Sequence, residues 1–242
     1  MDYPLDKTVQ ARASAMGDSH DIASVRDGVG KVPMHAATLS KRHGHERVLK
    51  GVIDIFGSFV MVILLSPLIL LLWLLVWLVD GSPVIYRRRV VGVCGEFDAY
   101  KFRTMHRDAD AMLAANPALH NAFRRNFKLK SDPRVTHLGT WLRKYSLDEL
   151  PQLFNVLRGQ MSLVGPRMIS AAELQRYGSY KGLLLSVKPG VTGYWQVRGR
   201  QDLSYTERIR MDVHYITNWS LALDLMILLQ TPAKVLRSEG AY

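Results

Sequence analysis

Residues 55–79 read IFGSFVMVILLSPLILLLWLLVWLV, a run of 25 residues without a formal charge. At about 1.5 Å per residue, a helix of this length measures roughly 37 Å, which is enough to cross a hydrocarbon core of about 30 Å. A straight spanning anchor is therefore the simplest interpretation. The run is not typical of a signal peptide, because it begins too late, is too long and has no small-residue cleavage site after it.

Two features of this run favour a helix that enters and leaves the same leaflet. Ser66 and Pro67 lie in its middle, where proline removes a backbone hydrogen bond and clashes with the preceding turn. We therefore expect a kink or break of the helix at Ser66 and Pro67, with the Ser66 hydroxyl satisfying part of the freed backbone. Basic residues flank both ends, and the positive-inside rule places both flanks on the cytoplasmic side only if the helix is re-entrant. These residues are Lys41, Arg42, Arg47 and Lys50 before the run and Arg87, Arg88 and Arg89 after it.

Composition limits the classes of protein to consider. The chain has 242 residues, 48% of them hydrophobic, so it is too apolar for a disordered polyelectrolyte. Its single cysteine, Cys94, excludes a disulfide framework. The formal charge of +11 implies an anionic partner, and the excess lies mainly after position 80. Charge alone leaves nucleic acid, an anionic bilayer and a phosphorylated substrate as alternatives.

We expect three segments, a flexible tail over 1–46, the membrane helix over 47–80 and a globular domain over 81–242. The domain combines strand and helix patterns, so its predicted class is α/β. Its patterns predict a short hairpin or an irregular β segment over 84–102, and helices over 104–115, 117–127 and 135–144. They also predict a loop over 188–193 and an amphipathic core or interfacial helix over 218–234.

Asp148 and Glu149 are the candidate chemical groups. Ser146 followed by Glu149 has the form of a capping box, which predicts a helix from here to Leu157 that ends at Gly159. In a purely structural interpretation, the two acidic residues complement the helix dipole. The alternative is a site for a divalent cation with phosphate, because Pro151 makes the turn irregular and basic residues surround it.

Several motifs in a fixed order resemble the bacterial monotopic phosphoglycosyl transferases, also called bacterial sugar transferases. The resemblance covers about residues 47–242 and includes the Ser-Pro break. The length and the closing Gly-Ala-Tyr further resemble the exopolysaccharide-initiating galactosyl-phosphate transferases of rhizobia. The motifs are KFRTM (101–105), DPRVT (132–136), LRKYSLDELPQL (142–153), MSLVGPR (161–167) and PGVTG (189–193) continuing through Gln196 to Gly199 and Arg200.

The resemblance implies an enzyme that transfers a sugar 1-phosphate from a UDP-sugar to undecaprenyl phosphate with Mg²⁺. This is the first membrane step of exopolysaccharide biosynthesis. It implies a monotopic α/β protein of the bacterial inner membrane, with a re-entrant helix, amphipathic interfacial helices and a small catalytic domain on the cytoplasmic face. Asp148 would be the nucleophile, and Glu149 would help to hold Mg²⁺ or relay a proton, so both are metal and catalytic candidates. Galactose is the first expectation for the sugar and glucose the second.

Basic residues within the matched motifs are expected to bind the diphosphate. A carboxylate attacks an anionic phosphate poorly unless cations neutralise the charge. Tyr194 and Trp195 either stack on uracil or pack. Met168 stands where the family usually has a second proline, which puts the stiffness of that loop in doubt. The substrate-binding set is Lys101, Arg103, Arg143, Arg167 and Arg200.

A membrane-anchored basic module for nucleic acid or an acidic protein is the rival interpretation. It explains the charge and the apolar run but leaves the ordered motifs without a cause. No helix-turn-helix or RNA-stacking motif is evident, so we expect no nucleic-acid partner. The expected partners are a UDP-sugar, undecaprenyl phosphate and inner-membrane lipid, and a homodimer is left open.

Overall fold

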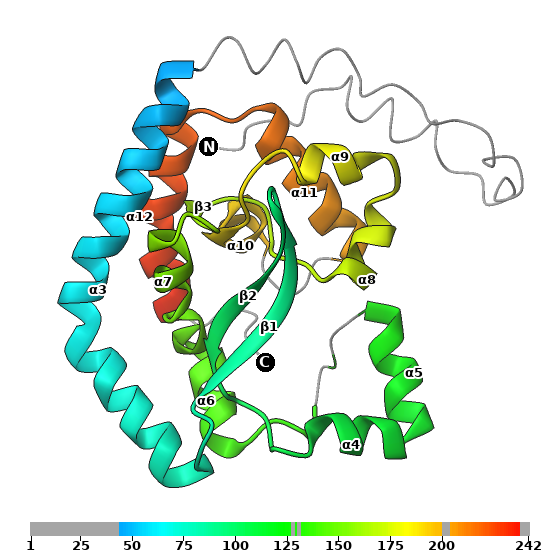
Figure 1. Ribbon diagram of the computed structural model, residues 1–242. Helices are drawn as coiled ribbons and strands as arrows, with labels where there is room; N and C mark the ends of the chain where they lie inside the picture. Colours follow the sequence, from blue (N-terminus) through cyan, green and yellow to red (C-terminus); the bar gives the residue numbers. More distant parts are fainter. Residues whose placement is uncertain (1–43, 127–128, 130–131, 200–203, 238–242) are drawn as a thin grey trace, which may run out of the picture. The chain divides into compact units, whose positions relative to one another are not determined.

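The computed structural model describes residues 44–126, 129, 132–199 and 204–237 (Figure 1). It is a mixed α/β arrangement, as expected. Nearly all of the predicted 1–46 tail, and Arg200 of the predicted substrate set, lie outside the described residues. The elements are α3 (Gly44–Asp80), β1 (Ile85–Gly92), β2 (Gly95–Phe102), α4 (Ala109–Ala115), α5 (Pro117–Asn126), α6 (His137–Lys144), η1 (Leu147–Glu149), α7 (Gln152–Leu157), β3 (Ser162–Val164), α8 (Ala171–Leu174), η2 (Gln175–Tyr180), α9 (Lys181–Leu184), β4 (Gly190–Thr192), α10 (Tyr194–Arg198), α11 (Tyr205–Thr217) and α12 (Leu221–Arg237).

Helix α3 contains the whole apolar run and stays helical through Pro67. Pro67 has no N–H for the carbonyl of Ile63, four residues earlier, and the Ser66 hydroxyl donates to that carbonyl at 2.8 Å instead. The expected role of Ser66 is therefore confirmed. Proline bends the helix without ending it, and Figure 1 shows α3 change direction part way along its length. Of the kink or break expected here, the structure therefore shows a bend within a continuous helix.

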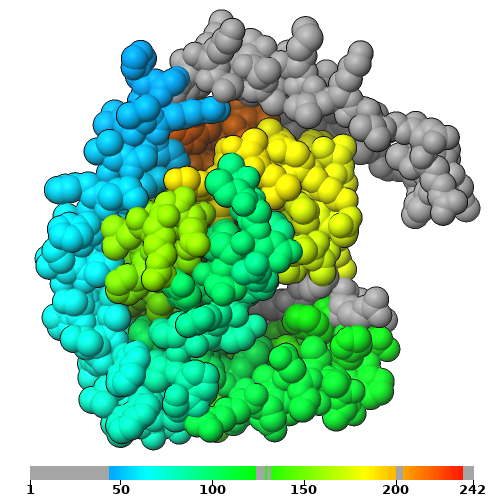
Figure 2. Space-filling view, in the orientation of Figure 1, coloured from blue at the N-terminus to red at the C-terminus, as the bar shows by residue number. Residues whose placement is uncertain are grey.

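The outer side of α3 is a continuous apolar surface. Large side chains from Val48 to Val79 are exposed along it, and Figure 2 shows the helix, blue to cyan, along one margin of the view. Within the described part of the chain, α3 is the one helix long and apolar enough to cross a membrane. Such a surface is stable only against lipid or another apolar partner.

The β1–β2 hairpin confirms the predicted hairpin. Its strands pair antiparallel from Ile85 opposite Phe102 to Gly92 opposite Gly95. Gly95 has a φ of +106°, a conformation that residues with a Cβ rarely adopt, and it closes the tight turn. Alternation turns Val90 and Phe97 into the core and leaves Arg89 exposed.

A second, parallel pair of strands joins two sequence motifs. In it, β3 pairs with β4, with Ser162 opposite Gly190 and Val164 opposite Thr192. The loop expected over 188–193 therefore contains a short strand. A Cβ on Gly190 would lie 2.1 Å from the backbone N of Gly165, so the close approach of the two backbones requires glycine.

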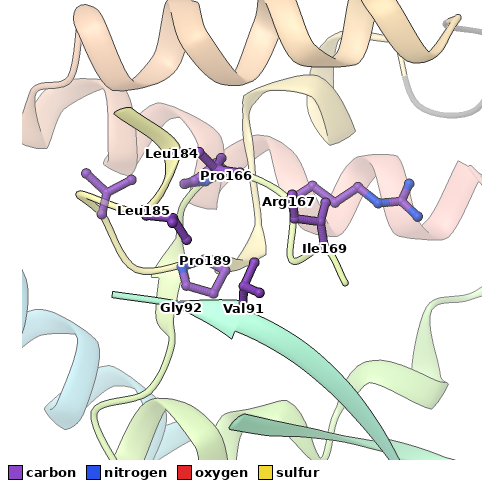
Figure 3. A pocket seen from close by; sticks show the side chains of 9 residues that line it. Val91, Gly92, Pro166, Arg167, Ile169, Leu184, Leu185 and Pro189 are labelled. Carbon is purple, nitrogen blue, oxygen red and sulfur yellow. The ribbon is translucent and has the colours of Figure 1, made fainter. Parts of the chain in front are cut away.

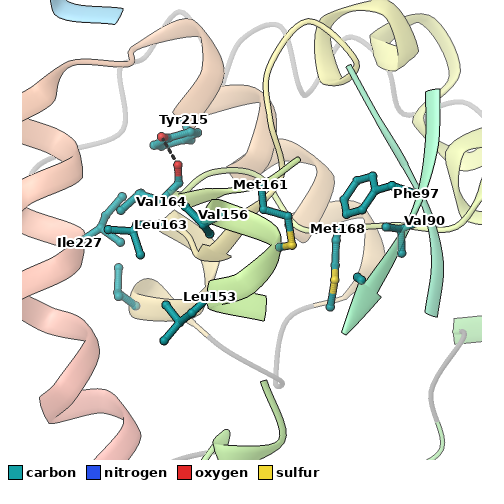
Figure 4. Close-up of a cluster of buried hydrophobic side chains, with 12 residues drawn as sticks. Val90, Phe97, Leu153, Val156, Met161, Leu163, Val164, Met168, Tyr215 and Ile227 are labelled. Carbon is teal, nitrogen blue, oxygen red and sulfur yellow. Dashed lines mark hydrogen bonds between the residues drawn. The ribbon is translucent and has the colours of Figure 1, made fainter. Parts of the chain in front are cut away.

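The main core lies between the hairpin, α7, β3 and the last two helices (Figure 4). It includes Val90 and Phe97 of the hairpin and Ile227 of α12. The contact of α12 with this core confirms the prediction of a core or interfacial helix in this region. Met168, which stands where the family usually has a second proline, is buried in the same cluster and packs in the core.

Several helix boundaries differ from the sequence patterns, most clearly those of α4 and of the turn before α7. Helix α4 begins at Ala109 instead of Thr104, because Met105 forms a β-bridge with Val135 and Thr104 accepts the N–H of Thr136 at 3.0 Å. The capping box expected at Ser146 is also wrong. Ser146 has a left-handed φ of +53° and its side chain makes no capping bond. Reciprocal capping boxes occur instead at Ser170–Glu173 and Ser204–Glu207.

Candidate active site

Asp148 and Glu149 lie in an irregular turn before α7. The turn η1 closes with bonds between residues three apart, from Glu149 N to Ser146 O at 3.2 Å and from Leu150 N to Leu147 O at 3.3 Å. Pro151 follows as the N-cap residue of α7. The single helix expected over these residues is therefore split into a 3-10 turn and a later helix, and the irregularity expected from Pro151 is present.

Lys101, which lies 47 residues before Asp148, meets both carboxylates. Its Nζ lies 2.6 Å from Glu149 Oε1 and 3.7 Å from Asp148 Oδ2. Asp148 is only 7% exposed. The ammonium group thus holds the pair at the end of β2 and compensates part of the cost of burying two negative charges.

Arg143 approaches the same turn from α6. Its Nε donates to Thr104 Oγ1 at 2.9 Å, which fixes the guanidinium against the segment after β2. Helix α6 comes this close because Gly139 has no side chain. A Cβ there would lie 2.1 Å from the carbonyl oxygen of Thr104. Burial lowers the pKa of Arg143, and the nearby charge of Asp148 opposes that change.

Burial makes the Asp148 carboxyl a weaker acid than an ordinary aspartate. Desolvation is the largest cause and raises the pKa of Asp148 to about 6, with Glu149 adding to the rise. Lys101 and Arg143 act in the opposite direction, since their positive charges favour the carboxylate. At neutral pH the group is thus mainly ionised yet more basic than an ordinary aspartate, which suits a nucleophile.

The donor set of this turn fits Mg²⁺ bound together with phosphate. Mg²⁺ is usually held by one or two carboxylates plus substrate phosphates and water, not by a cage of protein ligands alone. Asp148 and Glu149 supply two carboxylates. Within the described residues, no group of three or more His, Cys, Asp or Glu side chains is arranged around a common point. Two carboxylates match a site in which substrate phosphates supply further ligands.

A second polar cluster surrounds Trp195. The Cζ atoms of Arg167 and Arg208 each lie 5.4 Å from the centroid of its ring. Asp212 is buried beneath them and accepts the backbone N–H of Arg167 at 3.2 Å and the hydroxyl of Tyr177 at 2.8 Å. Burial raises the pKa of Asp212 to about 7. Figure 3 shows the Arg167 side chain extending away from the neighbouring apolar pocket.

These contacts favour packing for Trp195 over stacking on a base. Its side chain is 8% exposed, and two guanidinium groups lie over its ring. Sequence patterns did not point to Arg208 and Asp212. Their signal was helical spacing, since residues four apart lie on the same side of a helix.

Arg103 does not join either cluster. The strand β2 ends at Phe102, and the Arg103 guanidinium donates to the carbonyl of Asp80 and, at 2.8 Å, to that of Gly81. These carbonyls lie at the end of α3, so Arg103 caps the apolar helix. Of the expected site residues, the structure brings together Asp148, Glu149, Lys101 and Arg143. It places Arg167 beside Trp195 and Arg103 at the helix end.

A buried carboxylate close to a lysine and an arginine, in a chain that also carries a long apolar helix, fits a membrane-associated enzyme that handles charged groups. The family model described as bacterial sugar transferase matches residues 45–238. The chain belongs to this family, and it is a phosphoglycosyl transferase, which confirms the enzyme class implied by the motifs.

Three relatives illustrate the similarity. The chain is 47% identical to the undecaprenyl-phosphate galactose phosphotransferase of Salmonella typhimurium, over 84% of this chain and 43% of that protein. It is 44% identical to the exopolysaccharide production protein ExoY of Sinorhizobium fredii, over 81% of this chain and 88% of that protein. It is 36% identical to the UDP-glucose:undecaprenyl-phosphate glucose-1-phosphate transferase of Caulobacter vibrioides, over 100% of this chain and 82% of that protein. The chain thus spans less than half of the Salmonella protein and most of the other two.

Proposed function

We propose that this chain transfers galactose 1-phosphate from UDP-galactose to undecaprenyl phosphate, and so performs the first membrane step of exopolysaccharide synthesis. The observation that carries the proposal is the buried Asp148 carboxylate beside Lys101, in the turn of the LRKYSLDELPQL motif. The choice of galactose rests on the name of the Salmonella relative. Glucose is the second candidate, because the Caulobacter relative carries that name.

Asp148 acts as the nucleophile in this proposal. Its Oδ attacks the β-phosphorus of the UDP-sugar, and the bond from that phosphorus to the bridging oxygen breaks. UMP leaves with the electron pair, and the sugar phosphate remains on Asp148 as an acyl phosphate. An oxygen of undecaprenyl phosphate then attacks the same phosphorus and releases the Asp148 carboxylate. The burial that raises the pKa of Asp148 supports this role.

Cationic side chains lower the charge repulsion of this reaction. Lys101 and Arg143 both lie close to Asp148 and would contact the phosphates as they approach it. Arg167 and Arg200 would contact the diphosphate or the departing nucleotide. Guanidinium groups suit this task because they bind phosphate oxygens in pairs.

Asp148 and Glu149 are the residues that would hold Mg²⁺ with the diphosphate. When bound, Mg²⁺ supplies neutralisation of the developing charge on the phosphates. Glu149 is paired with Lys101 in this structure. If Glu149 moved away from Lys101, its carboxylate oxygen would be free to bind the ion or a proton.

We further propose that the enzyme is monotopic in the bacterial inner membrane. The tail over 1–46 and the catalytic domain over 81–242 lie on the cytoplasmic side, and the 47–80 segment is re-entrant. Pro67 lies inside α3, and the change of direction of this helix in Figure 1 supports this path. Helix α12 carries Leu225, Leu229 and Leu236, which are 52%, 81% and 75% exposed, and this supports contact with the membrane interface.

Release of UMP tests this function. Purified protein with Mg²⁺ and detergent-solubilised undecaprenyl phosphate is given a panel of UDP-hexoses. We expect UMP release to be fastest with UDP-galactose and next with UDP-glucose. No release from any member of the panel, together with tight binding of nucleic acid, would favour the rival basic module instead.

A further inference from the structure

Strand β3 has a strand partner on one edge only, in the described part of the chain. On its other edge, two side chains of α3 supply the hydrogen bonds that a third strand would make. Asp54 Oδ1 accepts the N–H of Leu163 at 3.0 Å, and Lys50 Nζ donates to the carbonyl of Val164 at 3.0 Å. Lys50 and Asp54 are four residues apart, so one face of α3 presents both groups to the strand.

These bonds lie in a buried polar network. Asp54 is 7% exposed, and its Oδ2 lies 2.8 Å from the hydroxyl of Ser162, which is also buried. Lys50 Nζ lies 2.7 Å from Asp224 Oδ2 of α12. Hydrogen bonds of buried charged groups are costly to leave unmade, so the arrangement is held firmly.

Helix α11 reaches the same point. The hydroxyl of Tyr215 lies 3.1 Å from the carbonyl of Val164, the bond drawn as a dashed line in Figure 4, and 2.7 Å from Asp224 Oδ1. The Val164 carbonyl thus accepts from Lys50 of the apolar helix and from Tyr215 of the catalytic domain, and the Ser162 hydroxyl also lies 2.8 Å from it. The end of β3 is therefore fixed to α3, α11 and α12 together.

The segment that follows this point is the Gly165-Pro166-Arg167 loop. Gly165 N donates to Thr192 O at 3.0 Å, and the Gly165 backbone packs against Gly190 without space for a Cβ. With one end of the loop fixed to α3 and its backbone in contact with β4, Arg167 has little freedom to shift relative to the apolar helix.

We propose that Lys50 and Asp54 are positioning residues, which hold the Gly165–Arg167 loop at a set place relative to the membrane helix so that Arg167 meets the nucleotide diphosphate. The inference rests on the proposed role of Arg167 in UDP-sugar binding. The two residues touch no reacting atom and act through the backbone of β3.

The first test is kinetic, with the full-length protein in lipid nanodiscs. Asp54→Ala and Lys50→Met should raise the KM for UDP-galactose at least about tenfold while kcat changes less than about threefold, since the loop binds the nucleotide end. Lys50→Arg should restore most of the affinity, because a guanidinium can donate to both the Val164 carbonyl and Asp224. The control is Asp98→Asn, which removes an exposed ion pair with Arg89.

A double-variant cycle separates positioning from general stability. If Asp54 acts through Arg167, then Asp54→Ala should add less than about twofold to the KM of Arg167→Ala, since the contact it positions is already gone. Fully additive effects on KM would overturn the inference.

A second readout does not depend on activity. Hydrogen exchange of the wild type and of Lys50→Met should show faster exchange confined to residues 162–167, with the β1–β2 hairpin unchanged. Unchanged exchange over 162–167 would overturn the proposal. If no UDP-sugar yields UMP, the proposed function fails, and this measurement still decides the positioning claim. If Asp54→Ala unfolds the chain, Lys50→Met, which keeps the Asp54 bond to Leu163, decides it by the same criteria.

Discussion

The Nζ atom of Lys101 lies 2.6 Å from Glu149 Oε1, which places a strand residue in direct contact with the acidic turn before α7. The same Nζ is 3.7 Å from Asp148 Oδ2. Lys101 is thus hydrogen-bonded to Glu149, whereas it lies farther from the Asp148 carboxylate. This asymmetry supports our proposal that Asp148 is the nucleophile and that Glu149 has a supporting role.

Replacement of Lys101 tests that asymmetry. Lys101 lowers the pKa of Asp148, so Lys101→Met should raise it further and shift the acidic limb of the pH–rate profile to higher pH. We also expect at least about a tenfold loss of turnover at pH 7, roughly 1.4 kcal/mol of transition-state stabilisation. The measurement is UMP release between pH 5 and pH 9. Lys181→Met, on α9, is the matched control, and a Lys101→Met profile that coincides with that of the control would contradict this role.

Arg143, Arg167 and Arg103 are expected to behave in two different ways. Arg143→Ala and Arg167→Ala, like Arg200→Ala, should lower UMP release at least about tenfold, with poor rescue by lysine. Arg103→Ala should instead destabilise the fold by about 1–3 kcal/mol, because the carbonyls at the end of α3 lose their donor.

Thermal unfolding and the KM for UDP-sugar, measured on each variant, separate the two groups. An Arg103→Ala protein with an unchanged melting temperature and a tenfold higher KM would return Arg103 to the substrate site. Wild-type rates for all three other variants would make those arginines ordinary surface cations.

Topology is tested by cysteine accessibility. In a Cys94→Ser background, which removes the exposed native thiol, His45→Cys and Tyr86→Cys should both resist a membrane-impermeant thiol reagent in intact cells. The expectation follows from basic residues at both ends of the segment. Labelling of one position alone would establish a true span. Pro67→Leu should shift the segment toward that span, because it restores the missing helix hydrogen bond.

The difference in stability between Asp148→Asn and the wild type should depend on pH in a defined direction. The pKa of Asp148 is raised to about 6 in the folded state, above its ordinary value. The contribution of this carboxyl to the free energy of unfolding is therefore complete at low pH and is lost as pH rises through about 6. Relative to wild type, Asp148→Asn should therefore gain stability between about pH 4 and pH 7, by at most about 3 kcal/mol. Thermal unfolding at several pH values measures this. A loss of stability that grows with pH would indicate that the carboxylate is a structural cap.

The hairpin, the final helix and the acidic turn could be predicted because local patterns determine them. Alternation and paired glycines specify β1–β2, and Pro151 makes the turn before α7 irregular. The motif resemblance grouped Lys101 with Asp148, although their contact is tertiary and has no spacing rule.

Arg103 illustrates what patterns could not supply. It stands two residues from Lys101, so strand alternation would put both on one face, but β2 ends at Phe102 and the alternation ends with it. The capping box at Ser146 failed for a related reason. The left-handed conformation of Ser146 turns the chain away from a regular helix start, and only the surrounding tertiary structure imposes that conformation.

Detection of a covalent adduct is the most direct test of Asp148 as the nucleophile. Wild-type protein incubated with UDP-galactose and Mg²⁺, without lipid acceptor, should release UMP and gain one hexose phosphate on the peptide that contains Asp148. Asp148→Asn should stay folded, since asparagine keeps any hydrogen bond that a cap would need, yet form no adduct. Glu149→Gln should form the adduct more slowly at the same residue. An active Asp148→Asn enzyme, or a hexose phosphate found on any other residue, would contradict the assignment of Asp148 as the nucleophile.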